Sequence, residues 1–564
     1  MKLLFYVFLL ATASPYFKAT AQGFTLHDVL GYPFPTELTS SGMGSKLAWA
    51  FNERGVRNVY VAEGPAFVPR KITGYVSDDG QEISSLSISK DGKWVVFVRG
   101  GDHSSGEPGA TVNPAFMAEP PKVQVWSVPF AGGETILLGE GDFPRPSPVS
   151  SEVAFIKGGQ VWISPINGAT PSKAYFTTRG INSAIQWSPD GLKLAFVSTR
   201  TDHAFVGVFT NLATPIKWLA PSFSRDVSPR WSPDGKKIAF IRLQGSGGAP
   251  DSILVERHRP WSIWTTDLET ETATCAWTSP ATLRGSVPST DGGFNLNWVA
   301  GDRIVFLSYQ DGWPHLYSLP AHGGQPLLLT PGNFMVEHLR VSPDMKWLLC
   351  SVNTGPDKLD IDRRHIAKVP VDKAAMELLT PGTGMETNPV ISGDGSSIAF
   401  LSATAQRPLL PAVMATEKDT FRLLGQDHIP IGFPTKQLVT PRQVIFKAPD
   451  GTNVHAQLFE PAVAKAKRPA IVYVHGGPQR QMVLGWHFMD YYSIDYALNL
   501  LRGHAYLDHS SELSTPFVIV PVVAWLFHAK EKPNQVSIKR MVRWFYLAQA
   551  RQRYSVGVLQ KLNT

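Results

Sequence analysis

The chain has 564 residues, of which 48 are glycine, 45 are proline and only 18% are charged. This length exceeds one hydrophobic core and predicts two or more domains, and the composition excludes a disordered chain or a coiled coil in favour of a turn-rich, strand-rich globular protein. The net charge is +7, but residues 500–564 hold nine Lys or Arg against three Asp or Glu, a difference of +6. The main body is therefore nearly neutral, and no nucleic-acid partner is expected for it.

The N-terminus predicts a secretory signal peptide over residues 1–21. Met1-Lys2 is a short positive end, an apolar stretch runs from Leu3 to Ala13, and Ala19-Thr-Ala21 fits a small-x-small cleavage site. We expect cleavage near Ala21 and a secreted or periplasmic bacterial protein, with an uncut membrane anchor as the alternative. No other apolar run reaches 18 residues, so no stable membrane span is expected.

One pattern recurs over residues 22–440: Ser-Pro-Asp-Gly, a polar residue, and then an apolar run that ends near Phe. Pro presets φ for such a turn, Asp can bond its own backbone, and Gly accepts a positive φ before the strand begins. The copies, including weak ones, start near residues 41, 89, 147, 188, 232, 298, 342 and 392. Their spacing is typical of four-stranded blades and predicts a TolB-like β-propeller of eight blades, or alternatively seven.

The repeat also assigns roles to several of its side chains. The Asp residues are interpreted as turn residues and not as metal ligands, and the Trp residues as packing between blades. Two long gaps, Gly101–Pro121 and Gly245–Pro260, are predicted to be excursions from the ring. Of the two cysteines, Cys350 ends an apolar run and favours a buried thiol, although one bridge to Cys275 could form in an oxidising compartment.

The pattern changes after Pro441. Residues 443–446 and 454–459 alternate with period two and predict a hairpin, and a buried strand over 470–474 runs into His475-Gly476-Gly477-Pro478. A propeller of Ser-Pro-Asp-Gly repeats, then a hairpin, then this strand and loop resembles the prolyl oligopeptidase family of serine peptidases, in particular its dipeptidyl-peptidase and acylaminoacyl-peptidase branches. The resemblance covers roughly residues 24–499.

The resemblance implies that residues 441–499 begin an α/β-hydrolase domain. It also implies that the loop of His475, Gly476, Gly477 and Pro478 belongs to the oxyanion side of the active site, because a Gly-rich turn lets backbone N–H groups approach a developing oxyanion. The alternative is a tight exit from a buried strand. No cofactor and no metal are expected, because His455, His475, His487 and His504 lack metal-site spacing.

The catalytic residues of the family are not found in the sequence. No Gly-x-Ser-x-Gly elbow occurs, and the family's Ser, Asp and His would all follow residue 478. Asp508-His509-Ser510 does not predict a triad, because adjacent side chains point in different directions. We interpret residues 500–564 as a divergent basic tail that replaces the rest of an incomplete hydrolase domain, through truncation or a shifted reading frame.

The expected fold is thus mainly β, an N-terminal propeller followed by an incomplete α/β-hydrolase domain. The resemblance implies an exported serine peptidase that acts on short peptides, with no activity expected in this chain because the Ser-Asp-His part is missing. The alternative is a non-catalytic propeller that binds peptides or protein partners.

Overall fold

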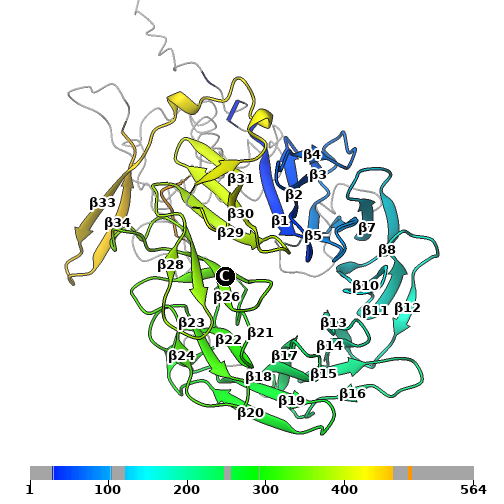
Figure 1. Ribbon diagram of the computed structural model, residues 1–564. Coiled ribbons are helices and arrows are strands. Elements are labelled where there is room, and N and C mark those ends of the chain that lie inside the picture. Colours follow the sequence, from blue (N-terminus) through cyan, green and yellow to red (C-terminus); the bar gives the residue numbers. More distant parts are fainter. Residues whose placement is uncertain are drawn as a thin grey trace, which may run out of the picture.

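The computed structural model describes residues 24, 28–29, 31–101, 103, 121–246, 256–290, 292–418, 420–460 and 481–485. These residues are almost entirely β, and Figure 1 shows their sheets arranged in a ring. The described part contains six sheets of four strands and one of eight, plus a separate two-stranded hairpin. The eight-stranded sheet consists of two four-stranded units joined by a single parallel pairing, Ala204 with Arg225.

Each four-stranded unit is built from consecutive strands that pair in chain order. The first unit contains β1 (Phe34–Ser40), β2 (Lys46–Glu53), β3 (Val56–Glu63) and β4 (Arg70–Lys71). The second contains β5 (Ile83–Ile88), β6 (Trp94–Arg99), β7 (Gln124–Pro129) and β8 (Ile136–Glu140). The third contains β9 (Asp142–Pro146), β10 (Glu152–Lys157), β11 (Gln160–Pro165) and β12 (Lys173–Phe176). The fourth contains β13 (Ile181–Trp187), β14 (Leu194–Thr199), β15 (Ala204–Phe209) and β16 (Lys217–Trp218).

The second half of the ring repeats this plan. The fifth unit contains β17 (Arg225–Trp231), β18 (Lys237–Leu243), β19 (Trp261–Asp267) and β20 (Ala273–Thr278). The sixth contains β21 (Asn297–Val299), β22 (Arg303–Ser308), β23 (His315–Pro320) and β24 (Leu327–Leu328). The seventh contains β25 (Val336–Val341), β26 (Trp347–Val352), β27 (His365–Pro370) and β28 (Glu377–Leu378). The last contains β29 (Met385–Ile391), β30 (Ser397–Thr404), β31 (Arg407–Ala415) and β32 (Phe421–Leu423).

The Ser-Pro-Asp-Gly segments form the turns between the first and second strands of their units. In the fourth unit Ser188 Oγ donates to Asp190 Oδ1 (2.5 Å) and accepts from the Lys193 amide (2.9 Å), while Gly191 has φ +67°. The Ser188 hydroxyl bond holds the pKa of Asp190 below its usual value. The same hydrogen bonds recur at the turns that open with Ser89, Ser232, Ser342 and Ser392, which confirms that the Asp residues serve the turns.

One buried position recurs in the second strand of each unit. In units with a Ser-Pro-Asp-Gly-type turn it lies eight residues after the opening serine. Its occupants are 0% exposed: Trp49, Phe97, Phe155, Phe196, Phe240, Phe306, Cys350 and Phe400. Burying such an aromatic side chain contributes about 1.5–3 kcal/mol. In the seventh unit a thiol fills this position, and burial raises the pKa of Cys350 to about 12, so the prediction of a buried, free thiol is confirmed.

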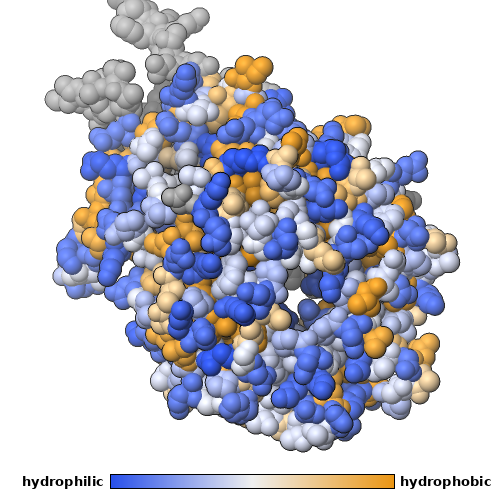
Figure 2. Space-filling view, viewed as in Figure 1, coloured by the Kyte–Doolittle hydropathy of each residue, from blue (hydrophilic) through white to orange (hydrophobic). Residues whose placement is uncertain are grey.

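The first strands of the units form the inner wall of the ring, because the first strands of successive units contact one another. Seven of these strands contain a residue with positive φ, at or next to the point where the pairing register shifts: Glu37, Ser85, Phe143, Ala184, Ser228, His338 and Asn388. Such bulges bend an edge strand and turn its side chains away from the sheet plane. The inner wall surrounds an opening, which is visible in Figure 2.

The ring closes between its first and last units without exchange of a strand, since both sheets are built from consecutive strands. Tyr32 and Trp49 pack in one buried cluster with Val390 and Ala399. Ser40 Oγ donates to the Ile391 carbonyl (2.6 Å), and Tyr32 Oη donates to the Pro408 carbonyl (3.2 Å). Closure therefore depends on side-chain packing and a few hydrogen bonds.

The hairpin of β33 (Arg442–Lys447) and β34 (Asn453–Leu458) follows the ring, as the sequence predicts. Figure 1 shows it on the outside of the ring, next to the seventh and last units. Short 3₁₀ turns are η2 (Leu283–Gly285), and η3 (Gln426–His428) and η4 (Thr435–Gln437), the last two of which connect β32 to the hairpin. No helix in the described ranges is long and apolar enough to cross a membrane.

Candidate functional site

The two faces of the ring differ in which loops they carry. Because neighbouring strands of a unit are antiparallel, the Ser-Pro-Asp-Gly turns all lie on one face, which we call the turn face. The loops between second and third strands lie on the opposite face. The hairpin contacts one of these loops at Leu359, and Leu438, just before the hairpin, contacts a second at Gln406. We call this side the hairpin face, and the two predicted excursions, between β6 and β7 and between β18 and β19, begin and end here.

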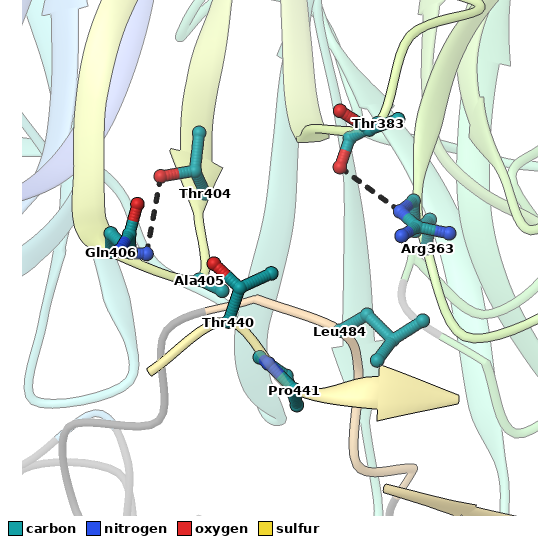
Figure 3. A pocket seen from close by; sticks show the side chains of 8 residues that line it. All are labelled: Arg363, Thr383, Thr404, Ala405, Gln406, Thr440, Pro441 and Leu484. Carbon is teal, nitrogen blue, oxygen red and sulfur yellow. Dashed lines mark hydrogen bonds between the residues drawn. The ribbon is translucent and has the colours of Figure 1, made fainter. Parts of the chain in front are cut away.

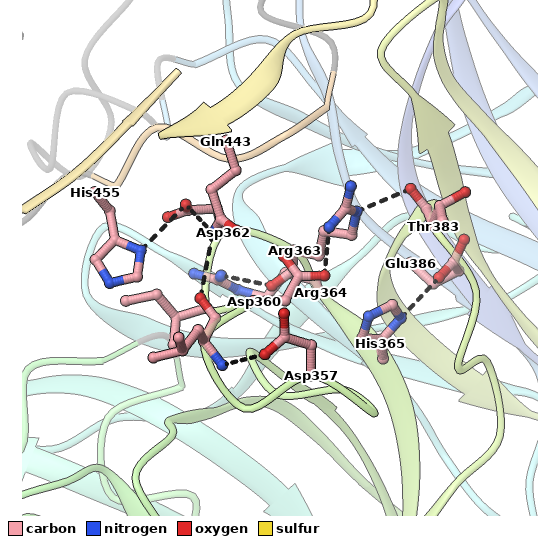
Figure 4. Close-up of polar contacts among 12 residues, drawn as sticks. Asp357, Asp360, Asp362, Arg363, Arg364, His365, Thr383, Glu386, Gln443 and His455 are labelled. Atoms are coloured by element: carbon pink, nitrogen blue, oxygen red, sulfur yellow. Dashed lines mark hydrogen bonds and ion pairs between the residues drawn. The ribbon is translucent and has the colours of Figure 1, made fainter. Parts of the chain in front are cut away.

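Asp362, in the loop between β26 and β27, connects the ring to the hairpin (Figure 4). Its side chain is nearly buried, and Oδ2 accepts from Gln443 Nε2 at 2.8 Å and lies 3.5 Å from His455 Nδ1. Oδ1 accepts from Gln481 Nε2 (3.3 Å), and the backbone carbonyl accepts from the Leu484 amide (2.6 Å). One carboxylate therefore holds the first strand of the hairpin and the segment 481–485, and it lies close to the second strand at His455.

Two arginines follow Asp362 and extend this polar cluster. Arg364 Nε donates to Glu337 Oε2 (2.5 Å), and its second guanidinium nitrogen donates to Gln481 Oε1 (3.0 Å). Arg363 pairs with Asp360 and donates through Nε to the Thr383 carbonyl (3.0 Å). Charge-assisted bonds to carboxylates are the strongest ordinary hydrogen bonds in proteins, so these pairs fix the loop rigidly.

His365 and Glu386 lie beneath the loop, 1% and 3% exposed, with Nδ1 and Oε2 3.5 Å apart. Neither atom has a hydrogen-bond partner within the described residues. The pair is closed off from solvent by the ring, so it is a buried polar contact of the scaffold and not an accessible acid–base pair.

A cavity of about 260 Å³ lies between the last two units and the start of the hairpin (Figure 3). Its lining is mainly polar: Arg363, Thr383, Thr404, Ala405, Gln406, Thr440, Pro441 and Leu484. Gln406 Nε2 donates to the Leu438 carbonyl (2.7 Å), which ties the segment before the hairpin to the ring. The lining contains no histidine, carboxylate or cysteine, so this cavity offers no general base.

Hydrolysis by a serine needs a hydroxyl, a neutral imidazole and a group that orients it. Among the described residues three serines approach a histidine ring: Ser84 and His103 (3.4 Å), Ser279 and His258 (3.5 Å), and Ser351 and His338 (3.3 Å). The hydrogen bonds that His103 donates to Asp142 and Glu82 raise its pKa to about 10, so it is protonated at neutral pH and cannot accept a proton.

The other two pairs do not meet the requirement either. Ser351 is fully buried, and His338 Nδ1 is shared with Thr387 Oγ1 (3.1 Å). The Ser279 contact is at the limit of a hydrogen bond, and no described carboxylate is bonded to His258. No charge-relay arrangement is therefore present in the described part of the chain.

The predicted oxyanion-side residues His475, Gly476, Gly477 and Pro478 lie outside the described residues, as do residues 1–21 and 500–564. Asp362, which holds the hairpin, and Gln481, which binds Asp362, carry no sequence signal beyond the charged run that ends in Asp362-Arg363-Arg364. Within the described ranges no group of three or more His, Cys, Asp or Glu side chains could hold a metal ion.

No model of a known protein family matches the sequence. Among solved structures, the chain is similar to Porphyromonas gingivalis dipeptidyl peptidase 4, with TM-score 0.54, 13% identity, and coverage of 77% of this chain and 65% of that one. A Bacteroides ovatus protein described as a dipeptidyl aminopeptidase IV gives TM-score 0.53, 16% identity, and 82% and 71% coverage.

A puromycin-hydrolyzing peptidase from Mycobacterium tuberculosis gives TM-score 0.50, 15% identity, and 73% and 64% coverage. The chain thus spans slightly less than two thirds of the Porphyromonas and Mycobacterium structures. The structures it resembles are peptidases of the prolyl oligopeptidase family, so the resemblance that the sequence predicts is confirmed at the level of the fold.

Proposed function

We propose that this chain is an exported peptide-binding protein of the prolyl oligopeptidase type, whose eight four-stranded units are the blades of a propeller. The ring admits short peptides through its opening, and the chain itself does not hydrolyse them. The observation that carries the proposal is a ring of four-stranded units, in a fold similar to that of the solved peptidases.

Two features support binding without hydrolysis. The 564 residues contain no Gly-x-Ser-x-Gly elbow, and none of the three serine–histidine contacts among the described residues meets the requirements for serine hydrolysis. Binding needs only the opening and the polar groups along its wall, both of which belong to the described ring. The signal peptide predicted over residues 1–21 supports export.

A serine peptidase is the second candidate. It is favoured by the fold and by the loop His475-Gly476-Gly477-Pro478, for which the sequence resemblance implies a role on the oxyanion side.

A fluorophosphonate probe on the purified 564-residue chain separates the two candidates. We expect no serine to be labelled, while a fluorescent tripeptide binds and a folded protein of about 100 residues competes poorly because it cannot enter the ring. Stoichiometric labelling of one serine would establish the peptidase instead. Equal binding of the tripeptide and the folded protein would contradict the role of the opening.

A further inference from the structure

Three inner strands carry an arginine at the same position of their units. Arg145 in β9, Arg230 in β17 and Arg340 in β25 each lie two residues after the positive-φ residue of the bulge and two before the serine that opens the turn. In all three, a terminal guanidinium nitrogen donates to the carbonyl of the preceding residue, at 3.3, 2.8 and 2.8 Å. The repeated contact shows that the bulge sets the same side-chain direction in each strand.

Arg145 and Arg230 bind different partners from those of Arg242 and Arg364, two other arginines of the ring. Arg242 donates to Asp226 at 2.7 and 2.8 Å, and Arg364 donates to Glu337 at 2.5 Å. By contrast, no carboxylate of the described residues pairs with Arg145 or Arg230, whose hydrogen bonds go only to backbone carbonyls. Within this part of the chain, most donors of the two planar groups therefore have no partner.

The two arginines lie on neighbouring parts of the inner wall. Trp187 Nε1 donates to the Arg145 carbonyl (2.9 Å), and Trp231 Nε1 donates to the Gln186 carbonyl (3.0 Å), so β9, β13 and β17 are linked side by side. Arg145 is exposed to water and Arg230 partly so. Desolvation by the surrounding protein lowers the pKa of both, and the charge of Arg145 lowers that of Arg230 further. Two like charges repel one another, and an anion between them relieves that repulsion.

We propose that Arg145 and Arg230 form a carboxylate-binding site on the inner wall of the ring, near its turn face. The inference builds on the proposed peptide-binding function and names its substrate class: short peptides that present a free carboxylate. The planar guanidinium group matches the geometry of a carboxylate. The site should therefore bind a carboxylate more tightly than a neutral amide. The carboxylate is that of the peptide C-terminus or of an Asp or Glu side chain.

The test uses the full chain and three fluorescent tripeptides in low salt: a neutral peptide with a free C-terminus, its C-terminal amide, and an amide that contains Glu. The variants are R145Q, R230Q and the double variant, with R70Q as the matched control. Arg70 also donates only to backbone carbonyls, those of Phe130 and Ala131, but lies in the outer strand β4. Thermal unfolding with and without inorganic phosphate gives a second readout that needs no peptide.

We expect the free carboxylate to bind about tenfold more tightly than the neutral amide in the wild type and in R70Q, and equally in the double variant. Phosphate should raise the melting temperature of the wild type and R70Q but not of the double variant. If the Glu-containing amide binds as tightly as the free acid, the site accepts any carboxylate. If it binds only as weakly as the neutral amide, the site is restricted to the peptide C-terminus.

Equal affinity for acid and amide in the wild type would overturn the inference while peptide binding stands. A preference that survives in the double variant would overturn it too. If no peptide binds but phosphate still stabilises through these arginines, the anion site stands and the peptide-binding function fails.

Discussion

The ring and the hairpin β33–β34 are adjacent in the chain but are held in place by different interactions. In the ring, side chains such as Phe240 and Phe400 are 0% exposed, and successive units pack face to face. In the hairpin, Phe446 is 52% exposed, and no residue of either strand is buried. Apolar burial therefore stabilises the ring, whereas polar contacts to Asp362 determine where the hairpin lies. We therefore expect a substitution in one of the two regions to destabilise that region without unfolding the other.

The largest effect is expected from truncation of the core. Phe240→Ala should lower the free energy of unfolding of the ring by about 3–5 kcal/mol, because it leaves a cavity at a fully buried position. Phe446→Ala in the hairpin should cost less than about 1 kcal/mol. Urea unfolding monitored by tryptophan fluorescence measures both. Similar losses of unfolding free energy in the two variants would contradict the difference between ring and hairpin.

The closure of the ring is the next target. A Cβ at Gly393 would lie 2.3 Å from backbone atoms of Gly42 and Met43, so Gly393→Ala should force the first and last units apart and cost about 3 kcal/mol. Gly382→Ala is the matched control, because its Cβ would meet no atom within 4 Å. Thermal unfolding should separate the two variants by several degrees. An unchanged melting temperature in Gly393→Ala would contradict closure by close backbone packing.

Removal of the Asp362 charge should loosen the hairpin while the ring keeps its stability. Asp362→Asn weakens the bonds from Gln443 and Gln481, which we expect to cost about 1–2 kcal/mol locally. Trypsin cleavage after Arg442 and Lys447 should become about tenfold faster, with little change in the melting temperature. Asp357→Asn, an exposed change in the same loop, should leave cleavage unchanged. Equal cleavage of both variants would show that other contacts hold the hairpin.

The smallest effect concerns pH and acts on the ring alone. The hydrogen bonds that His103 donates to Asp142 and Glu82 raise its pKa to about 10, above an unfolded value near 6.5. The stability that this charge contributes is complete below pH 6.5 and is lost as pH rises through about 10. After allowance for solvent screening we expect a loss of about 1 kcal/mol, which His103→Gln should abolish. Chemical unfolding at pH 6 and pH 10 checks this. An equal loss of unfolding free energy between the two pH values in the wild type and in His103→Gln would exclude the histidine as its source.

Much of the ring could be predicted from the sequence because each turn is a local feature. Ser, Pro, Asp and Gly make their bonds within six residues, as at Ser188–Lys193, and the apolar strand follows directly. The hairpin and the buried Cys350 thiol follow from equally local patterns. The predicted starts near residues 41 and 298, which lack Pro-Asp-Gly, also fall at turns between first and second strands. At these two starts, the apolar strand pattern that follows the turn is what predicts the repeat.

The hairpin contacts could not be predicted, because they join residues 80 to 120 positions apart. Gln443 and Gln481 are ordinary polar residues in the sequence, and only the fold brings them to Asp362. The equivalence of Arg145 and Arg230 is visible only once both are counted back from the turn serines. The roles of His475, Gly476, Gly477 and Pro478 stay predictions.

The closure of the ring without a shared strand has a consequence for how the chain folds. Each sheet is completed by contiguous residues, so its pairing can begin as soon as that stretch of chain has been synthesised. The contact between Ser40 and Ile391 spans 351 residues and must wait until the last unit is made. We expect an open row of units to precede the ring, with closure as the final step. For the same reason, moving the chain ends to a loop between two other units should leave every sheet intact.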